Sequence, residues 1–180
     1  RPNIALITRI ADSHSAFFAS TADIAAAKAE IFQAIEGLSI AILNRDDAFY
    51  ATLHAAAIAA GAKQVISFGH HPEAAYRLVS ITDHDAGMTI KACLAGTDCV
   101  FELRMYGRHL AENAMGVLAC VAAAGLPADT AAAALVDCQP PSGRGQRHNG
   151  IYNNCKISII DDSYNANPAS MAAAFSSLAA

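Results

Sequence analysis

The 180-residue sequence predicts an α/β fold, in which helices flank a mostly parallel sheet that is accompanied by an antiparallel three-stranded meander. Three short apolar runs, at residues 3–8, 39–44 and 64–69, are typical of strands covered on both faces. Ala-rich segments with helical spacing separate these runs, which indicates parallel strands joined by right-handed crossovers. Hydrophobic residues make up 54% of the chain, enough to bury a substantial core.

Two helices alternate with these strands in the first part of the chain. The first is predicted at residues 23–36, where apolar side chains recur every three or four positions. The second, at residues 48–60, is rich in alanine, and Gly61 ends it.

The pattern changes after the third strand. Residues 76–82, 88–94 and 99–105 read as short strands separated by tight turns, which predicts the antiparallel meander. A long helix at residues 109–124 follows, and Gly125 ends it.

The last part of the chain contains a candidate domain boundary. Pro127 opens a helix that extends to about residue 137, and the Pro/Gly-rich residues 138–149 then predict a linker. A buried strand at residues 157–160 is expected next, and it ends at Asp161 and Asp162.

Composition excludes several classes of protein. A net charge of −4 provides no basic footprint for nucleic acid. No apolar run reaches the roughly 18 residues of a membrane span, and no signal peptide is recognisable. The five cysteines include no CxxC pair, so we expect reduced, mostly buried thiols in a cytoplasmic protein.

The carboxylate pair is the strongest candidate site. Adjacent carboxylates are costly unless a metal, hydrogen-bond donors or water lie beside them, and Asn165 and Asn167 add amides close to Asp161 and Asp162. Ligands of open α/β sheets bind beyond the carboxyl ends of strands. A small-molecule site is therefore favoured here, with its ligand left open.

Candidates near the first two strands have ordinary structural alternatives. His14 follows a strand, and Lys28 lies on a predicted helix, but such residues are more often solvated. Asn44, Asp46 and Asp47 could bind hydroxyls or a metal, although turn chemistry explains them better.

Two further candidates could bind an anion. The run from Gly107 to Asn113 enters a helix N-terminus, whose free N–H groups and dipole favour negative charge, although capping is the simpler explanation. Arg144, between two glycines, could reach a phosphate, although a lone linker arginine commonly has no such role.

The order of several motifs resembles that of the Mur ligases of peptidoglycan synthesis. The matching runs span the chain: RPNIALITRIADSH, IAAAKAEIF, AILNRDD, GRHLAENAMGVLA, SGRG and IDDSYNANPASM. The DDSYNANP run is most similar to members that use D-Ala-D-Ala. The resemblance implies an ATP- and Mg²⁺-dependent amide ligase, in which the terminal carboxylate of UDP-MurNAc-tripeptide is phosphorylated and the amine of D-Ala-D-Ala attacks the acyl phosphate.

The resemblance also implies residue roles. Lys28 matches a catalytic lysine that carbon dioxide carbamylates, which turns a cation into an oxygen ligand for Mg²⁺. His14 matches the histidine at the same metal. Asn113 matches the residue beside adenine, Arg144 the one that reaches the ATP phosphates, and Asp162 the one that binds the ribose hydroxyls.

The remaining matches lie on loops. Tyr164 matches a residue on the nucleotide side of its loop, and Asn165 and Asn167 match residues on the dipeptide side. Asn44 matches the asparagine of an NxDD motif, which implies a nucleotide-binding role.

Some features depart from the family pattern. Arg9 and Leu110 stand where asparagine is usual, and no GxxxxGK[ST] phosphate loop occurs in the chain. By the resemblance, residues 1–140 are the later part of the central ATP-binding domain. Residues 141–180 are the linker and the start of a Rossmann-like C-terminal domain. We therefore expect a piece of a longer, monomeric enzyme, inactive by itself.

Two alternatives stay open. The first is another ligase of the superfamily, similar to folylpolyglutamate synthase or cyanophycin synthetase, although the SYNANP run argues against it. The second is a non-catalytic module that binds a nucleotide or a partner protein.

Overall fold

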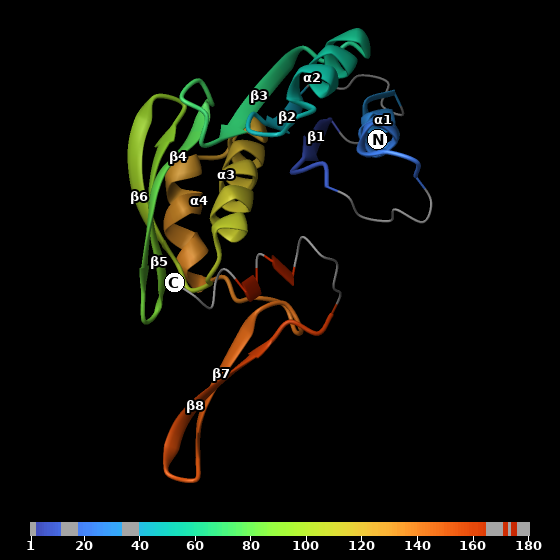
Figure 1. Cartoon of the computed structure of the whole chain (residues 1–180). Coiled ribbons are helices and arrows are strands. Elements are labelled where there is room, and N and C mark those ends of the chain that lie inside the picture. Colours follow the sequence, from blue (N-terminus) through green and yellow to red (C-terminus); the bar gives the residue numbers. More distant parts are fainter. Residues whose placement is uncertain (1–2, 12–17, 34–39, 165–170, 173, 176–180) are drawn as a thin grey trace.

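The computed structural model of the chain describes residues 3–11, 18–33, 40–164, 171–172 and 174–175 (Figure 1). Its strands are β1 (Ile4–Ile7), β2 (Ile40–Asn44), β3 (Gln64–Gly69), β4 (Tyr76–His84), β5 (Gly87–Leu94), β6 (Thr97–Leu103), β7 (Gln146–Tyr152) and β8 (Cys155–Asp161). Its helices are α1 (Thr21–Gln33), α2 (Tyr50–Ala59), α3 (Arg108–Ala123), α4 (Ala128–Ala134) and the 3₁₀ helix η1 (Leu135–Asp137). None of the described helices is long and apolar enough to cross a membrane.

One six-stranded sheet forms the body of the molecule, in the order β1-β2-β3-β4-β5-β6. Neighbours from β1 to β4 are parallel, and β4, β5 and β6 pair in antiparallel fashion. The predicted fold class is therefore confirmed. The meander continues the parallel sheet, because Phe68 and Gly69 of β3 pair with Tyr76 and Arg77 of β4.

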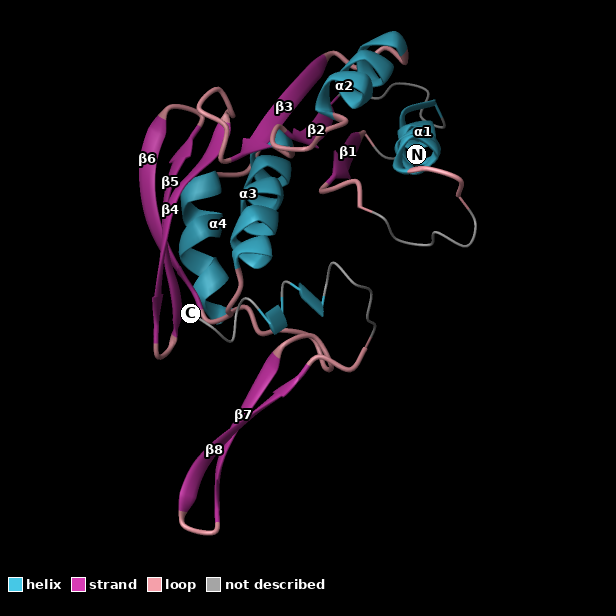
Figure 2. Cartoon of the chain, viewed as in Figure 1, coloured by secondary structure: helices cyan, strands magenta, loops and turns pink. Residues whose placement is uncertain are grey.

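Helices cover the sheet on both faces (Figure 2): α3 and α4 lie on one side, and α1 and α2 on the other. Side chains of β2 alternate between the two resulting cores. Ile42 belongs to the core that includes α3, whereas Ala41 and Leu43 belong to the core of α1 and α2. The central strands are thus buried on both faces, as their continuous apolar runs predict.

The buried face of α1 differs from the predicted one. The helix begins at Thr21 because the Ser20 hydroxyl accepts a hydrogen bond from the Asp23 N–H over 3.2 Å, in the manner of an N-cap. Ile24 and Phe32 are buried, but Ile31, which the spacing placed on the same face, is 39% exposed. Residues 34–36 of the predicted helix lie outside the described part.

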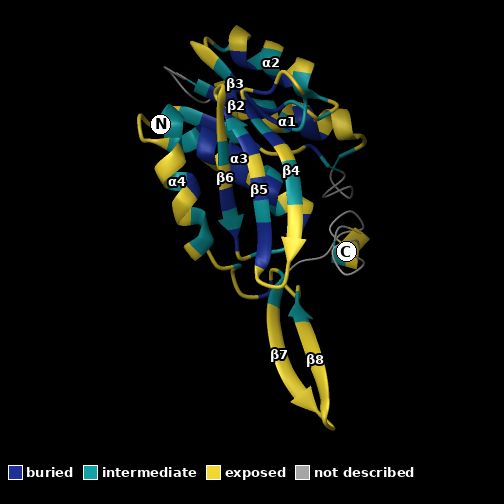
Figure 3. Ribbon diagram, turned by 90° about the vertical axis from the view of Figure 1, so that its left-hand side faces the viewer, coloured by how far each residue is buried: buried dark blue, intermediate teal, exposed yellow. Residues whose placement is uncertain are grey.

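The predicted linker and the strand after it are corrected by the structure. Residues 146–149, at the end of the predicted linker, belong to β7, which pairs with β8 in an antiparallel hairpin that projects from the body. The strand predicted to be buried is exposed: Ile157 is 38% and Ile159 56% accessible (Figure 3). Asn153 and Asn154, with φ of 48° and 63°, form the two-residue turn that a type I′ hairpin requires.

The cysteines are more exposed than predicted. All five are free thiols, of which Cys93, Cys99 and Cys120 are half-buried, while Cys138 and Cys155 are exposed. Cys138 and Cys155 fall in the η1–β7 connection and in the hairpin, neither of which contributes to the two cores. Desolvation raises the pKa of the Cys99 and Cys120 thiols, which disfavours their reactive thiolate form.

Candidate functional site

The carboxyl ends of β1, β2 and β3 meet at one edge of the sheet, where polar side chains tie the loops together. Asn44 is 7% exposed, and its amide donates to the Thr8 carbonyl over 3.1 Å. Its side-chain oxygen accepts from the Asp46 N–H over 2.9 Å. Both polar atoms of the Asn44 side chain therefore form hydrogen bonds with the backbone. Its nucleotide-binding role stays a prediction.

The two aspartates after β2 also bind backbone. The Asp46 carboxylate accepts a hydrogen bond from the His70 N–H over 2.5 Å. At the preceding residue, Gly69, an added Cβ would lie 2.2 Å from that carboxylate. Asp47 accepts from the N–H groups of Ile10 and Phe49 over 2.7 Å and 2.8 Å. Within the described residues, no three His, Cys, Asp or Glu side chains are placed to hold a metal ion.

The N-terminus of α3 faces the same edge. Gly107 precedes the helix with φ of 116°, and no side chain of the described part caps its first turn, so N–H groups there remain available. Glu112 interacts with Arg108 over 3.2 Å and lies 3.3 Å from the Nε2 atom of His70. The separation from His70 is within ion-pair range, but the ring nitrogen is not in hydrogen-bonding geometry.

The pKa of His109 depends on its burial and on the charged groups around the N-terminus of α3. Desolvation holds the pKa of its imidazole below the ordinary value, and the Arg9 guanidinium adds to that shift. The carboxylates of Glu112 and Asp162 oppose the shift by favouring the charged ring. The loops after β1 and β8 thus both lie within electrostatic range of the α3 N-terminus.

The base of the β7–β8 hairpin brings Arg144 and Tyr164 together. The guanidinium carbon of Arg144 lies 4.2 Å from the centroid of the Tyr164 ring. The Tyr164 N–H donates to the Gly143 carbonyl over 3.0 Å, and Gly143 has φ of 72°. A Cβ at Gly143 would lie 3.0 Å from the Tyr164 nitrogen, so only glycine allows this approach without displacement.

The adjacent carboxylates have different surroundings. Asp161 accepts from the Ser163 N–H over 3.2 Å and from its hydroxyl over 2.6 Å, which lowers the pKa of Asp161. Asp162 is exposed. The hydrogen-bond donors that the pair was expected to need are therefore present for the first carboxylate, while the second remains accessible to a ligand.

The remaining predicted residues are exposed on helices or lie outside the described part. Lys28 is exposed on α1, and Asn113 is exposed on α3, one turn after His109. His14, Asn165 and Asn167 lie outside the described residues.

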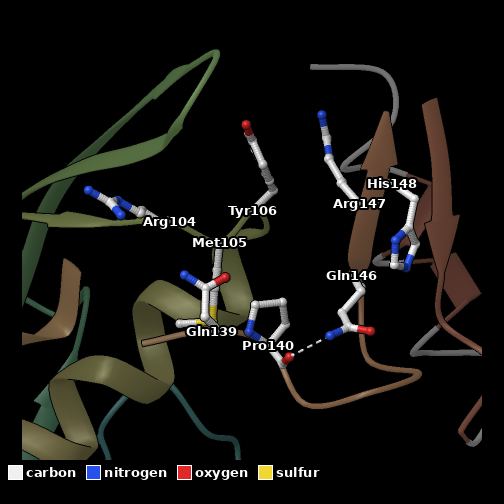
Figure 4. Close-up of a pocket in the computed structure, with 9 residues that line it drawn as sticks. Arg104, Met105, Tyr106, Gln139, Pro140, Gln146, Arg147 and His148 are labelled. Carbon is white, nitrogen blue, oxygen red and sulfur yellow. Dashed lines mark hydrogen bonds between the residues drawn. The ribbon is translucent and has the colours of Figure 1, made fainter. Parts of the chain in front are cut away.

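One contact of this region was missed by sequence reasoning. Arg147 places its guanidinium carbon 3.7 Å from the centroid of the Tyr106 ring, beside a pocket of about 170 Å³. Figure 4 shows this pocket between the β6–α3 connection and the start of β7. No local sequence motif predicts this contact, because Tyr106 and Arg147 are far apart in the sequence.

Comparisons with known proteins show which family the chain resembles. Residues 1–121 match the family described as the Mur ligase middle domain. The chain is 31% identical to the UDP-N-acetylmuramoyl-tripeptide–D-alanyl-D-alanine ligases of Rickettsia prowazekii, over 97% of its length, and Escherichia coli, over 99%. It spans 38% of the length of each of these relatives.

Solved structures of ligases with the same fold superimpose on the chain. A crystal structure of MurF from Acinetobacter baumannii superimposes with a TM-score of 0.88 at 28% identity, covering 99% of this chain and 37% of that one. MurF from Thermotoga maritima, solved in complex with ADP, has a TM-score of 0.82 at 18% identity, which supports the fold alone.

Proposed function

Because the chain belongs to the Mur ligase middle-domain family, we propose that it forms part of an ADP-forming ligase that joins D-Ala-D-Ala to UDP-MurNAc-tripeptide. The observation that carries this proposal is that the similarity to ligases of that name extends over 97% and 99% of the chain. It therefore includes the hairpin and its carboxylates, beyond the family match to residues 1–121.

The residues around the α3 N-terminus are suited to a nucleotide. In the proposed role, Asn113 contacts the adenine, and Asp162 accepts hydrogen bonds from the ribose hydroxyls. Arg144 offers a planar donor for phosphate oxygens, and its stacking on Tyr164 restricts its conformations. Asn44 fixes the loops beneath them through its two backbone hydrogen bonds.

The proposed Mg²⁺ site depends on a modification of Lys28. Its exposure on α1 leaves the amine accessible to carbon dioxide, and a carbamate would supply the oxygen ligands that Mg²⁺ accepts. His14 is proposed as the second ligand. When bound, the ion would neutralise negative charge on the phosphates during transfer.

The proposed chemistry has two steps. The terminal carboxylate of the tripeptide attacks the γ-phosphorus of ATP, giving an acyl phosphate and ADP. The amine of D-Ala-D-Ala then attacks the acyl carbon, and the tetrahedral intermediate expels phosphate. In the first step Arg144 offsets negative charge, while the hairpin and α3 hold the nucleotide in line.

We further propose a division of the chain near residue 140. Residues 1–140 would belong to the central ATP-binding domain, and residues 141–180 would contain the linker and the start of a C-terminal ligase domain, whose Asn165 and Asn167 would bind the dipeptide. The separate two-stranded sheet of β7 and β8 supports this division. The family resemblance favours a cytoplasmic monomer.

The test is a ligation assay on the protein as its gene encodes it. With ATP, Mg²⁺, UDP-MurNAc-tripeptide and D-Ala-D-Ala, mass spectrometry should detect UDP-MurNAc-pentapeptide, together with ADP in equal amount. Parallel reactions replace UDP-MurNAc-tripeptide with folate and D-Ala-D-Ala with glutamate. Product in the folate reaction alone would favour a folylpolyglutamate synthase-like ligase, and nucleotide binding without any product would favour a non-catalytic module.

A further inference from the structure

The base of the β7–β8 hairpin is a hydrogen-bonded unit. The Gly145 N–H donates to the Asp161 carbonyl over 2.8 Å, and the Tyr164 N–H donates to the Gly143 carbonyl over 3.0 Å. Arg144 lies between these two ties and stacks on Tyr164. Any movement of the hairpin as a body therefore carries these side chains with it.

Among the described residues, a contact to the β6–α3 connection and a hydrogen bond to the η1–β7 connection hold this unit in place. The Arg147 guanidinium lies over the Tyr106 ring at 3.7 Å, and the Gln146 side chain donates to the Pro140 carbonyl over 3.4 Å. The pocket of about 170 Å³ separates the same segments (Figure 4), so this junction is not close-packed. A single ring–guanidinium contact therefore has more influence here than it would in a filled interface.

Tyr106 is itself anchored on its other side. Its hydroxyl donates to the Asp85 carbonyl over 2.5 Å, in the turn between β4 and β5. Along the chain it lies two residues before Arg108, the first residue of α3. The ring is thus held by the meander and placed at the start of the helix whose N-terminus faces the candidate site.

We propose that Tyr106 is a positioning residue: its ring docks Arg147 and thereby holds the hairpin, with Arg144 and Asp162, beside the N-terminus of α3. This inference rests on the proposed function, in which those two hairpin residues bind the nucleotide. A cation–π contact at a partly exposed site contributes roughly a two- to fivefold factor to the docked population.

The orientation of the hairpin tests the docking without any nucleotide. Residual dipolar couplings of backbone amides in the 180-residue chain should fit one alignment tensor for the sheet and the hairpin. In Tyr106→Leu, the hairpin couplings should shrink and need a separate tensor. Tyr106→Phe keeps the ring but loses the hydrogen bond to Asp85, so its couplings should lie between those of wild type and Tyr106→Leu. The matched control Tyr152→Leu, whose ring lies exposed near the hairpin tip, should behave as wild type.

Steady-state ligation by the protein as its gene encodes it tests the consequence. Tyr106→Leu and Arg147→Met should each raise the KM for ATP two- to fivefold, with kcat within twofold of wild type. The double variant should show no larger increase than either single variant, because both changes remove the same contact.

Two outcomes would overturn the inference: hairpin couplings in Tyr106→Leu and Arg147→Met that match wild type, or an unchanged KM in both variants. Arg147→Met alters an exposed strand residue, so it retains the test if Tyr106→Leu fails to fold. Wild-type protein that does not ligate would count against the proposed function, while the couplings still decide whether Tyr106 docks the hairpin.

Discussion

Asp161 and Asp162 are adjacent carboxylates whose surroundings assign them different tasks. Two hydrogen bonds from Ser163 stabilise the charged form of Asp161 and lower its pKa. Asp162 keeps its oxygens in solvent, within electrostatic range of His109. The first residue therefore shapes the turn after β8, and the second is available to a ligand.

Replacing Asp162 should weaken nucleotide binding specifically. A charge-assisted hydrogen bond contributes about 1.5–3 kcal/mol, so we expect Asp162→Asn to raise the KM for ATP roughly 10- to 100-fold in the ligation assay. The KM for D-Ala-D-Ala should stay unchanged. Asp98→Asn, at an exposed position near the start of β6, is the matched control. Equal KM values for the two variants would remove the ribose-binding role from Asp162.

Lys28 provides a second prediction at the scale of one side chain. If its carbamate supplies oxygen ligands, Lys28→Ala should abolish ligation, because the alanine side chain offers none. Added acetate or another short carboxylic acid should restore part of the rate by occupying the vacated position. Lys63→Ala removes another exposed lysine, directly before β3, and should ligate normally. Full activity in Lys28→Ala without any added acid would contradict the assignment.

Among the elements, α3 approaches the sheet closely because a glycine faces it. A Cβ added at Gly116 would lie 3.2 Å from Phe68 and 3.3 Å from Leu6. These distances are shorter than ordinary van der Waals contact, and Phe68 is fully buried. The position of the α3 N-terminus relative to the strand ends therefore depends on this contact.

Enlarging Gly116 should destabilise the fold. We expect Gly116→Leu to lower the free energy of unfolding by about 1–3 kcal/mol or more, because a packed core resists added volume. Urea denaturation monitored by circular dichroism measures the change. Val117→Leu, on the exposed side of the same turn, should alter the free energy by less than about 0.5 kcal/mol. A loss no larger than that of the control would show that the interface adjusts freely.

The elements that were predictable are those with a strong local signal. The buried strands and the meander follow from apolar runs and tight turns, and their existence is confirmed. The hairpin was misread because β7 is polar and β8 apolar, so each strand suggested a different environment when taken alone. The signal that could have identified it is Asn153-Asn154, a pair suited to positive φ between two segments of equal length.

At the scale of the whole molecule, the site could be predicted only in part. The topology brings the ends of β1 to β3 and the start of α3 to one edge, as a parallel sheet requires. Other features depend on contacts between distant segments. These are the hydrogen bonds to backbone groups made by Asn44, Asp46 and Asp47, and the stacking of Arg147 on Tyr106. Such contacts leave no periodic trace in the sequence, so they became visible only in the folded chain.

Nucleotide binding by the isolated 180-residue chain is the last prediction, and it concerns all these parts together. The chain has no GxxxxGK[ST], so phosphate binding would rest on Arg144 and the α3 N-terminus. Because each missing charge-assisted hydrogen bond costs about 1.5–3 kcal/mol, we expect the chain to bind Mg-ATP at least about 100-fold more weakly than the protein as its gene encodes it.

Isothermal titration calorimetry on both proteins measures this difference. Arg144→Ala should remove most of the heat that the 180-residue chain still produces, whereas Arg77→Ala, on β4, should not. A dissociation constant within tenfold of that of the protein as its gene encodes it would mean that the strand ends and α3 bind the phosphates without a phosphate loop. The hairpin residues would then be secondary contacts, because the affinity would come from the edge of the six-stranded sheet itself.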